Sequence, residues 1–248
     1  MSLRDSLIGL AEGVLNSRPA VNWRLRDVDA ATRETYFRVA PYTMTSPERI
    51  AAVCDAVRHV IRAGIPGAYV ECGVWRGGSS MAAALTFLAA GDSSRDLYLF
   101  DTFEGMSAPS EHDKRAGDQT PAASLLETSG QSEKIWCKAG IEDVSANMAS
   151  TGYPAARISL CKGMVEATLP AQAPERIAVL RLDTDWYEST RHELEQLWTR
   201  LSPGGVLIID DYGYWAGARK AVDEFFASRP ILLNRIDQTG RIAVKLAD

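Results

Sequence analysis

The chain has 248 residues, of which 46% are hydrophobic and 24% are charged, and this is enough apolar material for one α/β domain with a sizeable core. Its formal net charge of −5 and the scatter of its basic residues argue against a nucleic-acid partner. Charges interrupt the apolar run at the amino terminus, and no stretch is long enough to span a membrane. We therefore expect a soluble, cytoplasmic protein without nucleic-acid or membrane partners.

The amino-terminal part is expected to be a helical extension, residues 1–45, ahead of a main domain at residues 46–248. Apolar residues recur on one helical face of this extension, at Leu3, Leu7, Ile8, Leu10 and Val14. Such a face has to be buried against the same chain or against a neighbour. We expect a homo-oligomer, a dimer or higher.

The main domain alternates helices with short apolar strands. A helix is expected from Ser46, its N-cap, to about Gly64, and a strand at 68–72 then leads through glycines into a helix at 79–90. Further strands are expected at 97–101, 134–137, 157–161, 177–183 and 206–209. Helices are expected after residue 185, ending at 202–205, and around 218–225. The alternation predicts a doubly wound, mostly parallel α/β sheet of seven strands.

Two stretches stand apart from this alternation. Residues 231–236 and 241–246, with Gly240 between them, predict a terminal hairpin that adds an antiparallel strand to the sheet. Residues 104–133 are rich in Ser, Ala, Pro, Gly and charge, and they predict a mobile lid or insert rather than a second domain. The four cysteines are far apart and are expected to be reduced core residues: Cys54, Cys72, Cys137 and Cys161.

Four aspartates follow two of the expected strands. Asp183 and Asp185 come after the strand at 177–183, and Asp210 and Asp211 come after the strand at 206–209. Carboxyl ends of strands are where open α/β sheets bind ligands, and carboxylate oxygens suit Mg²⁺. A single aspartate there could simply cap the next helix. Four of them would repel one another without a cation, so the pattern favours a magnesium site.

A second candidate site lies where the first strand meets its helix. Glycines in the segment from Glu71 to Ser79 would let a ligand approach the backbone and the helix amino terminus. The spacing matches neither the dinucleotide fingerprint nor a P-loop. Asp101 ends the next strand and could accept hydrogen bonds from ribose hydroxyls, so S-adenosylmethionine fits best. The glycines alone could also only make a tight turn.

These motifs resemble those of the macrocin-type sugar O-methyltransferases, a class I family dependent on S-adenosylmethionine. The resemblance covers about residues 40–230 and rests on four segments in order: residues 69–79, 100–106 and 182–190, and Pro203-Gly204-Gly205 followed by Asp210-Asp211-Tyr212. It implies a Rossmann-like fold and transfer of a methyl group to a hydroxyl of a small molecule, typically a sugar of an antibiotic.

The resemblance also implies roles for single residues. It implies that Asp183, Asp210 and Asp211 hold Mg²⁺ and that Asp185 is the general base. His192 is a rival base, although its place in the following helix favours a surface or core role. Expected cofactor contacts are Met44, Glu71, Gly73, Trp75, Arg76, Gly77, Ser79, Asp101, Gly140, Ile141 and Asp183, with Tyr42, Thr43 and Glu142 as further candidates.

The acceptor is left open by the sequence. It should be set by residues 1–45, by the insert at 104–133 and by the aromatic segment 212–215, whose rings could stack on a sugar or pack in a loop. A catechol-type methyltransferase shares the metal chemistry, and a non-catalytic protein of the same fold would share the cofactor site. A metal-dependent hydrolase would use the acids but would leave the glycine segment and Asp101 unexplained.

Overall fold

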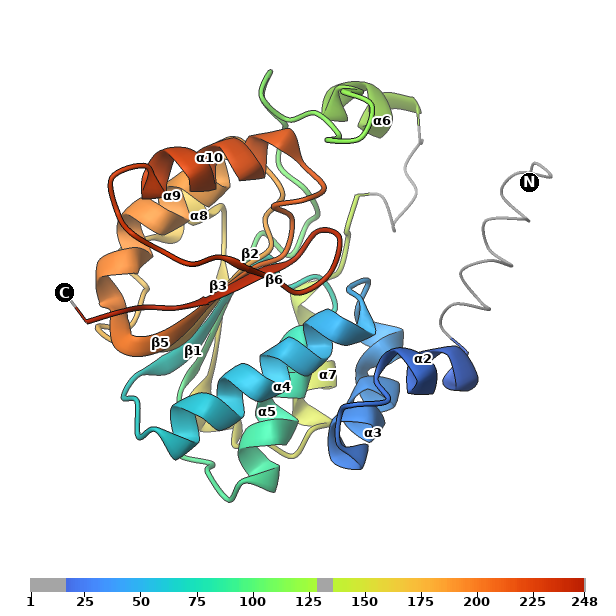
Figure 1. Cartoon of the computed structure of the whole chain (residues 1–248), viewed down its shortest axis with the longest axis vertical. Helices are drawn as coiled ribbons and strands as arrows, with labels where there is room; N and C mark the ends of the chain where they lie inside the picture. Colours follow the sequence, from blue (N-terminus) through green and yellow to red (C-terminus); the bar gives the residue numbers. More distant parts are fainter. Residues whose placement is uncertain (1–16, 129–135, 248) are drawn as a thin grey trace.

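The computed structural model describes residues 17–128 and 136–247, which form one seven-stranded sheet with helices on both faces (Figure 1). The strand order is β3-β2-β1-β4-β5-β7-β6; β1 to β5 run parallel, and β7 is antiparallel to both of its neighbours. The strands are β1 (Ala68–Cys72), β2 (Leu97–Asp101), β3 (Ile158–Lys162), β4 (Ile177–Leu182), β5 (Leu201–Ile209), β6 (Asn234–Arg235) and β7 (Arg241–Val244). The predicted doubly wound, mostly parallel sheet is confirmed.

Each central strand is buried on both sides, because alternate residues enter two different cores. In β5, Val206 and Ile208 belong to the core on one face, and Leu207 and Ile209 belong to the core on the other. The first core is covered by α4 (Pro47–Arg62), α5 (Gly78–Ala89) and α7 (Ile141–Ala149). The second is covered by α8 (Val165–Thr168), α9 (Tyr187–Leu197) and α10 (Ala216–Phe226).

Two amino-terminal helices extend the first of these layers. Helices α2 (Arg18–Arg24) and α3 (Ala30–Val39) lie beside α4 in Figure 1, followed by the 3₁₀ turn η1 (Ala40–Tyr42). They place Val21, Leu25, Tyr36 and Val39 in the same core as α4 and α5. The apolar face from Leu3 to Val14 lies outside the described residues, so homo-oligomerisation stays a prediction.

The insert contains helix α6 (Ala122–Thr128), which lies beyond the carboxyl ends of the strands (Figure 1). Within the insert, Lys114 bridges to Pro121, and Arg115 bridges to Trp215, the residue that precedes α10. We call the described part of this insert, residues 104–128, the lid segment. Two further 3₁₀ turns, η2 (Ala155–Arg157) and η3 (Trp198–Arg200), precede β3 and β5.

Three details of the predicted elements are wrong. Trp136 and Cys137 form a turn and not a strand; Cys137 has a left-handed φ of 48°, while Lys134 and Ile135 lie outside the described residues. Strand β5 begins at Leu201, because Gly204 and Gly205 form backbone hydrogen bonds with Lys245 instead of only ending the helix. The terminal hairpin strands are shorter than predicted.

Within the described residues, no helix has the length and apolar character needed to cross a membrane.

Candidate active site

The site lies where the order of the parallel strands reverses. Strands β1 and β4 are neighbours in the sheet; the chain goes on from β1 to β2 on one side of this pair, and from β4 to β5 on the other side. The segments that follow β1 and β4 therefore diverge at their carboxyl ends, and a crevice opens between them. A cavity of about 780 Å³ occupies this position. Its lining combines the turn after β1, the end of β2, the ends of β4 and β5, and the lid segment.

Gly73 brings the ends of β1 and β4 together. It has φ +83°, and a β-carbon built on it would lie 2.0 Å from the carbonyl oxygen of Asp183. The amide of Asp183 donates to the carbonyl of Cys72 across the same junction, at 2.8 Å. Because only glycine fits both the conformation and the contact, this residue fixes how Asp183 enters the cavity.

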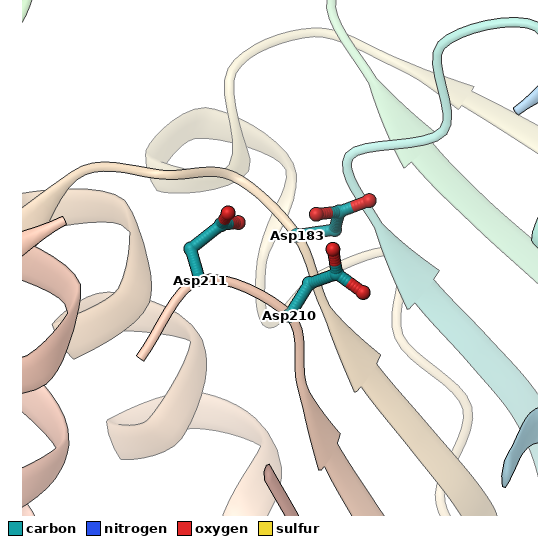
Figure 2. A group of neighbouring side chains, drawn as sticks. All are labelled: Asp183, Asp210 and Asp211. Atoms are coloured by element: carbon teal, nitrogen blue, oxygen red, sulfur yellow. The ribbon is translucent and has the colours of Figure 1, made fainter. Parts of the chain in front are cut away.

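Three carboxylates converge beside this junction. Figure 2 shows Asp183 after β4 and Asp210 and Asp211 after β5, with one oxygen of each lying within 4.8 Å of the others. Asp210 is buried, whereas Asp183 keeps 27% of its side chain exposed to the cavity. Within the described part of the chain, no hydrogen-bond donor reaches the buried Oδ2 of Asp211. The cluster therefore offers one acceptor oxygen, Oδ2 of Asp211, that the described residues leave unsatisfied.

Two arginines compensate part of this negative charge. The guanidinium of Arg181, 1% exposed, contacts Glu71 at 2.5 Å, Asp183 at 2.7 Å and Asp210 at 2.5 Å. Arg49 forms an ion pair with the other oxygen of Asp210 and lies 3.0 Å from Asp237. Buried carboxylates are stable only when they are paired in this way.

The ionisation of the cluster follows from burial and from these partners. Burial raises the pKa of Asp183 and of Asp211 well above the usual value, and neighbouring carboxylates act in the same direction. Burial opposes ionisation of Asp210 as well, but Arg181 and Arg49 outweigh it and lower the pKa of Asp210. Asp183 and Asp211 therefore carry the unfavourable charge that a cation would stabilise.

Asp185 faces the same cavity from the turn after β4. Its φ is 68°, a left-handed conformation that is uncommon for a residue other than glycine. Its Oδ1 accepts a hydrogen bond from the indole Nε1 of Trp215, at 2.7 Å. Burial, followed by the nearby Asp183, raises the pKa of Asp185 to about 7. A carboxylate of this basicity can accept a proton near neutral pH.

The same cavity is lined by most of the residues predicted to bind the cofactor. The lining residues among them are Met44, Glu71, Gly73, Trp75, Ser79, Asp101 and Asp183, together with Tyr42 and Thr43. The Oδ2 of Asp101 accepts the amides of Val74 and Trp75, at 2.6 and 3.0 Å, and its Oδ1 accepts the amide of Phe103 at 2.7 Å. Oγ1 of Thr102 also lies 3.4 Å from this Oδ1, but its hydroxyl donates to the carbonyl of Gly105 at 2.6 Å, so Oδ1 retains room for another donor.

Four of the predicted cofactor residues lie outside the cavity lining, at Arg76, Gly77, Gly140 and Ile141. Arg76 forms an ion pair with Asp143 at 2.8 Å, and Gly77 caps α5 with φ +90°. Gly140 caps α7, and Ile141 is the first residue of that helix. Glu71 lines the cavity, but its carboxylate is engaged by Arg181, Tyr69 and Ser80. Arg76 and Gly77 thus belong to the turn and the cap of α5, and Gly140 and Ile141 to the start of α7, away from the cavity lining.

Part of the cavity lining is apolar and aromatic. The lid segment contributes Met106, Leu125 and Leu126, the residues just before α10 contribute Tyr214 and Trp215, and Met164 follows β3. His192, the rival base, lies in α9 and does not line the cavity; its Nε2 is buried without a hydrogen-bond partner in the described structure. Asp185 is therefore the better placed of the two candidates.

Three features of the site were not predicted from the sequence: Arg181, Arg49 and the bond from Trp215 to Asp185. A signal for Arg181 was present, because a charged residue in the middle of the apolar run Ile177–Leu182 needs a buried partner. Glu71 interrupts the apolar strand β1 in the same way, and the two residues face each other in the sheet register. The contacts of Arg49 and Trp215 depend on tertiary structure and left no such signal.

Comparison with known proteins identifies the family. The model of the macrocin O-methyltransferase family (TylF) matches residues 10–244. The chain belongs to this family. It is accordingly an S-adenosylmethionine-dependent O-methyltransferase, as the sequence resemblance implies.

Several similar proteins are O-methyltransferases according to their names. The 8-demethyl-8-(2,3-dimethoxy-alpha-L-rhamnosyl)-tetracenomycin-C 4'-O-methyltransferase of Streptomyces olivaceus is 38% identical, over 80% of this chain and 74% of that protein. The mycinamicin III 3''-O-methyltransferase of Micromonospora griseorubida is 32% identical, over 77% of this chain and 72% of that protein. The demethyldecarbamoylnovobiocin O-methyltransferase of Streptomyces niveus is 30% identical, over 95% of this chain and 90% of that protein. The solved structure of the O-methyltransferase NovP aligns with a TM-score of 0.72 and 27% identity, covering 83% of each chain.

Proposed function

We propose that the protein is a Mg²⁺-dependent enzyme that transfers the methyl group of S-adenosylmethionine to a sugar hydroxyl of a glycosylated natural product. One observation carries this proposal: the carboxylates of Asp183, Asp210 and Asp211 share a single cavity with the glycine turn after β1. The cavity volume of about 780 Å³ is in the range of cavities that enclose a small organic ligand.

The donor set of the cluster fits a hard divalent cation. It consists of carboxylate oxygens alone, and the buried Oδ2 of Asp211 is an acceptor that no group in the described part of the chain satisfies. Asp183, Asp210 and Asp211 would hold the cation, while Arg181 and Arg49 fix the orientation of Asp210. Mg²⁺ bound there would lower the pKa of a coordinated hydroxyl and hold it for attack.

The other side chains position the reactants and move the proton. Gly73, Trp75, Ser79 and Asp101 would hold the cofactor beside the cluster, with Oδ1 of Asp101 open to a ribose hydroxyl. Asp185 accepts the proton of the acceptor hydroxyl as the methyl group is transferred, because its pKa of about 7 suits a base at neutral pH. Direct transfer needs no covalent enzyme intermediate; positioning supplies most of the rate enhancement.

The cavity lining favours an acceptor in which a sugar is attached to a larger apolar group. The carboxylates of the acid cluster would meet the sugar hydroxyls, and Leu125, Leu126 and Tyr214 would cover an apolar aglycone. The named activities of the relatives support this assignment, since the acceptors in their names are a rhamnosyl-tetracenomycin, mycinamicin III and demethyldecarbamoylnovobiocin.

The proposal is tested by incubating the purified protein with S-adenosylmethionine and those three compounds as probe acceptors. We expect mass spectrometry to show addition of one methyl group to at least one of them. Excess chelator should abolish the product and added Mg²⁺ should restore it. Asp185→Asn should abolish turnover while leaving affinity for S-adenosylhomocysteine within about twofold, because the base makes no ground-state contact with the cofactor. Turnover that survives the chelator would refute the metal dependence.

A further inference from the structure

The tryptophan that contacts Asp185 has no role in the chemistry described so far. The indole Nε1 of Trp215 donates to Oδ1 of Asp185 at 2.7 Å, and only 8% of Trp215 is exposed. Because an indole N–H can only donate, the carboxylate of Asp185 must be the acceptor, and its Oδ1 is the oxygen that accepts. The indole thus fixes Oδ1, and with it the orientation of the carboxylate, while Oδ2 makes no bond to Trp215.

The conformation of Asp185 requires such a support. A left-handed φ of 68° costs a residue with a β-carbon about 1 kcal/mol or more, and it persists only where surrounding contacts determine it. Trp186, the next residue, stacks edge-on against Trp215 with ring centroids 5.0 Å apart. The turn is thus held by Trp215 through a hydrogen bond to one residue and a ring contact with the next.

Trp215 is itself placed by the lid segment. The amide of Ala116 donates to the carbonyl of Tyr214, and the amide of Ala216 donates to the carbonyl of Lys114, both at 2.8 Å. The ring of Trp215 packs in a small apolar cluster to which the lid contributes Ala122 and Leu126. The lid segment therefore holds the backbone on both sides of Trp215, and the indole of Trp215 holds Asp185.

We propose that Trp215 is a positioning residue that couples the lid segment to the orientation of Asp185. The role of Asp185 as base rests on the proposed function, whereas the coupling between lid, indole and carboxylate does not. The lid thereby does more than enclose the acceptor, because its docking along residues 214–216 holds the acid in its reactive orientation.

The coupling is tested without a substrate by nuclear magnetic resonance of the tryptophan indole N–H groups, with Trp215→Phe used to assign the resonance of Trp215. In Asp185→Ala we expect this resonance to shift and its exchange with solvent to accelerate about tenfold, as for loss of one hydrogen bond. The resonance of Trp198, which packs on Phe225 and Phe226, should not move. An unchanged Trp215 resonance in Asp185→Ala would overturn the proposal.

The lid is tested with Ala116→Pro, which deletes the amide that donates to Tyr214 and restricts Arg115 to the extended backbone that suits its bridge to Trp215. We expect the exchange of the Trp215 indole to accelerate here too, with the Trp198 resonance again unchanged as a control for folding. Protection of Trp215 equal to that of the wild type would show that the lid does not support it, and would overturn the coupling.

Turnover separates positioning from a merely structural role. With an acceptor that the wild-type enzyme methylates, Trp215→Phe should lower kcat about tenfold or more and change the KM for S-adenosylmethionine less than twofold, because it misplaces the base and not the cofactor. The matched variant Trp198→Phe should keep the wild-type kcat. Equal kcat values for Trp215→Phe and wild type would overturn the proposal, whereas an inactive wild type would count against the proposed function alone and leave the resonance tests standing.

Discussion

At the residue scale, Gly73 is a position where a single added carbon should destabilise the protein. Its left-handed conformation and the carbonyl of Asp183, 2.0 Å from where a β-carbon would lie, both exclude a side chain. We expect Gly73→Ala to lower the free energy of unfolding by about 3 kcal/mol, through strain and overpacking together. Binding of S-adenosylhomocysteine, measured by calorimetry, should weaken in the same variant.

Gly91 is the matched control for this substitution. It has a similar φ of +76°, but nothing lies within 4 Å of the position that its β-carbon would occupy. Gly91→Ala should therefore lose only about 1 kcal/mol, from the backbone strain, and should keep its ligand affinity. Equal losses for the two variants in urea unfolding would show that the contact with Asp183 is not what requires glycine.

Arg181 is the residue on which the buried charges depend. Replacing it with Met leaves Glu71 without its 2.5 Å partner inside the core, and we expect the free energy of unfolding to fall by about 3 to 5 kcal/mol. Combining Arg181→Met with Glu71→Gln should recover part of that loss. A double-mutant cycle in urea should give a coupling energy above about 1 kcal/mol, and strictly additive losses would contradict the pairing.

At the element scale, one buried aspartate ties the lid segment to the start of α9. Asp113 is 1% exposed and accepts the amides of Ser110 and Tyr187, at 2.6 and 2.8 Å. In Asp113→Ala the lid should detach more often, and trypsin should cleave after Lys114 and Arg115 about tenfold faster, because cleavage follows local opening. Asp118→Ala, which removes the exposed partner of Arg115, should change this rate far less.

The loop between β6 and β7 is joined to α4 by Asp237. Its carboxylate accepts Ser46 Oγ at 2.6 Å and lies 3.0 Å from Nε of Arg49. Burial acts against ionisation here, but Arg49 and the hydrogen bonds outweigh it and lower the pKa of Asp237. A lowered pKa in the folded state stabilises the protein above about pH 4 and loses this effect as the pH falls further.

Asp237 should therefore stabilise the protein only at a pH where its carboxylate is ionised. Asp237→Asn should reduce the free energy of unfolding by about 1 kcal/mol at pH 7, and the difference from wild type should shrink toward pH 3. Asp96→Asn, at an exposed ion pair with Arg157, should cost about 0.5 kcal/mol or less at either pH. A difference at Asp237 that grew on acidification would contradict the assignment.

At the scale of the whole molecule, the sheet and the acid cluster could be predicted because they depend on local patterns. Apolar runs separated by helices specify a parallel sheet, and residues that follow neighbouring strands meet at one edge, as Asp183 and Asp210 do. The predicted strand at 134–137 is wrong at Trp136 and Cys137, since a short apolar run does not reveal that Cys137 adopts a left-handed turn. The bond from Trp215 to Asp185 could not be predicted, because it depends on how the lid docks.

The central claim is that the acid cluster holds one divalent cation at the reacting hydroxyl, and it is tested most directly by electron paramagnetic resonance with Mn²⁺ as the probe ion. The wild-type protein should bind about one Mn²⁺ per chain, displaced by Mg²⁺, and Asp211→Asn should weaken binding about tenfold or more. Asp96→Asn, at an exposed carboxylate that pairs with Arg157 and not with the cluster, should bind as the wild type does. Absence of a bound ion in the wild type, or binding that Asp211→Asn leaves unchanged, would contradict the account.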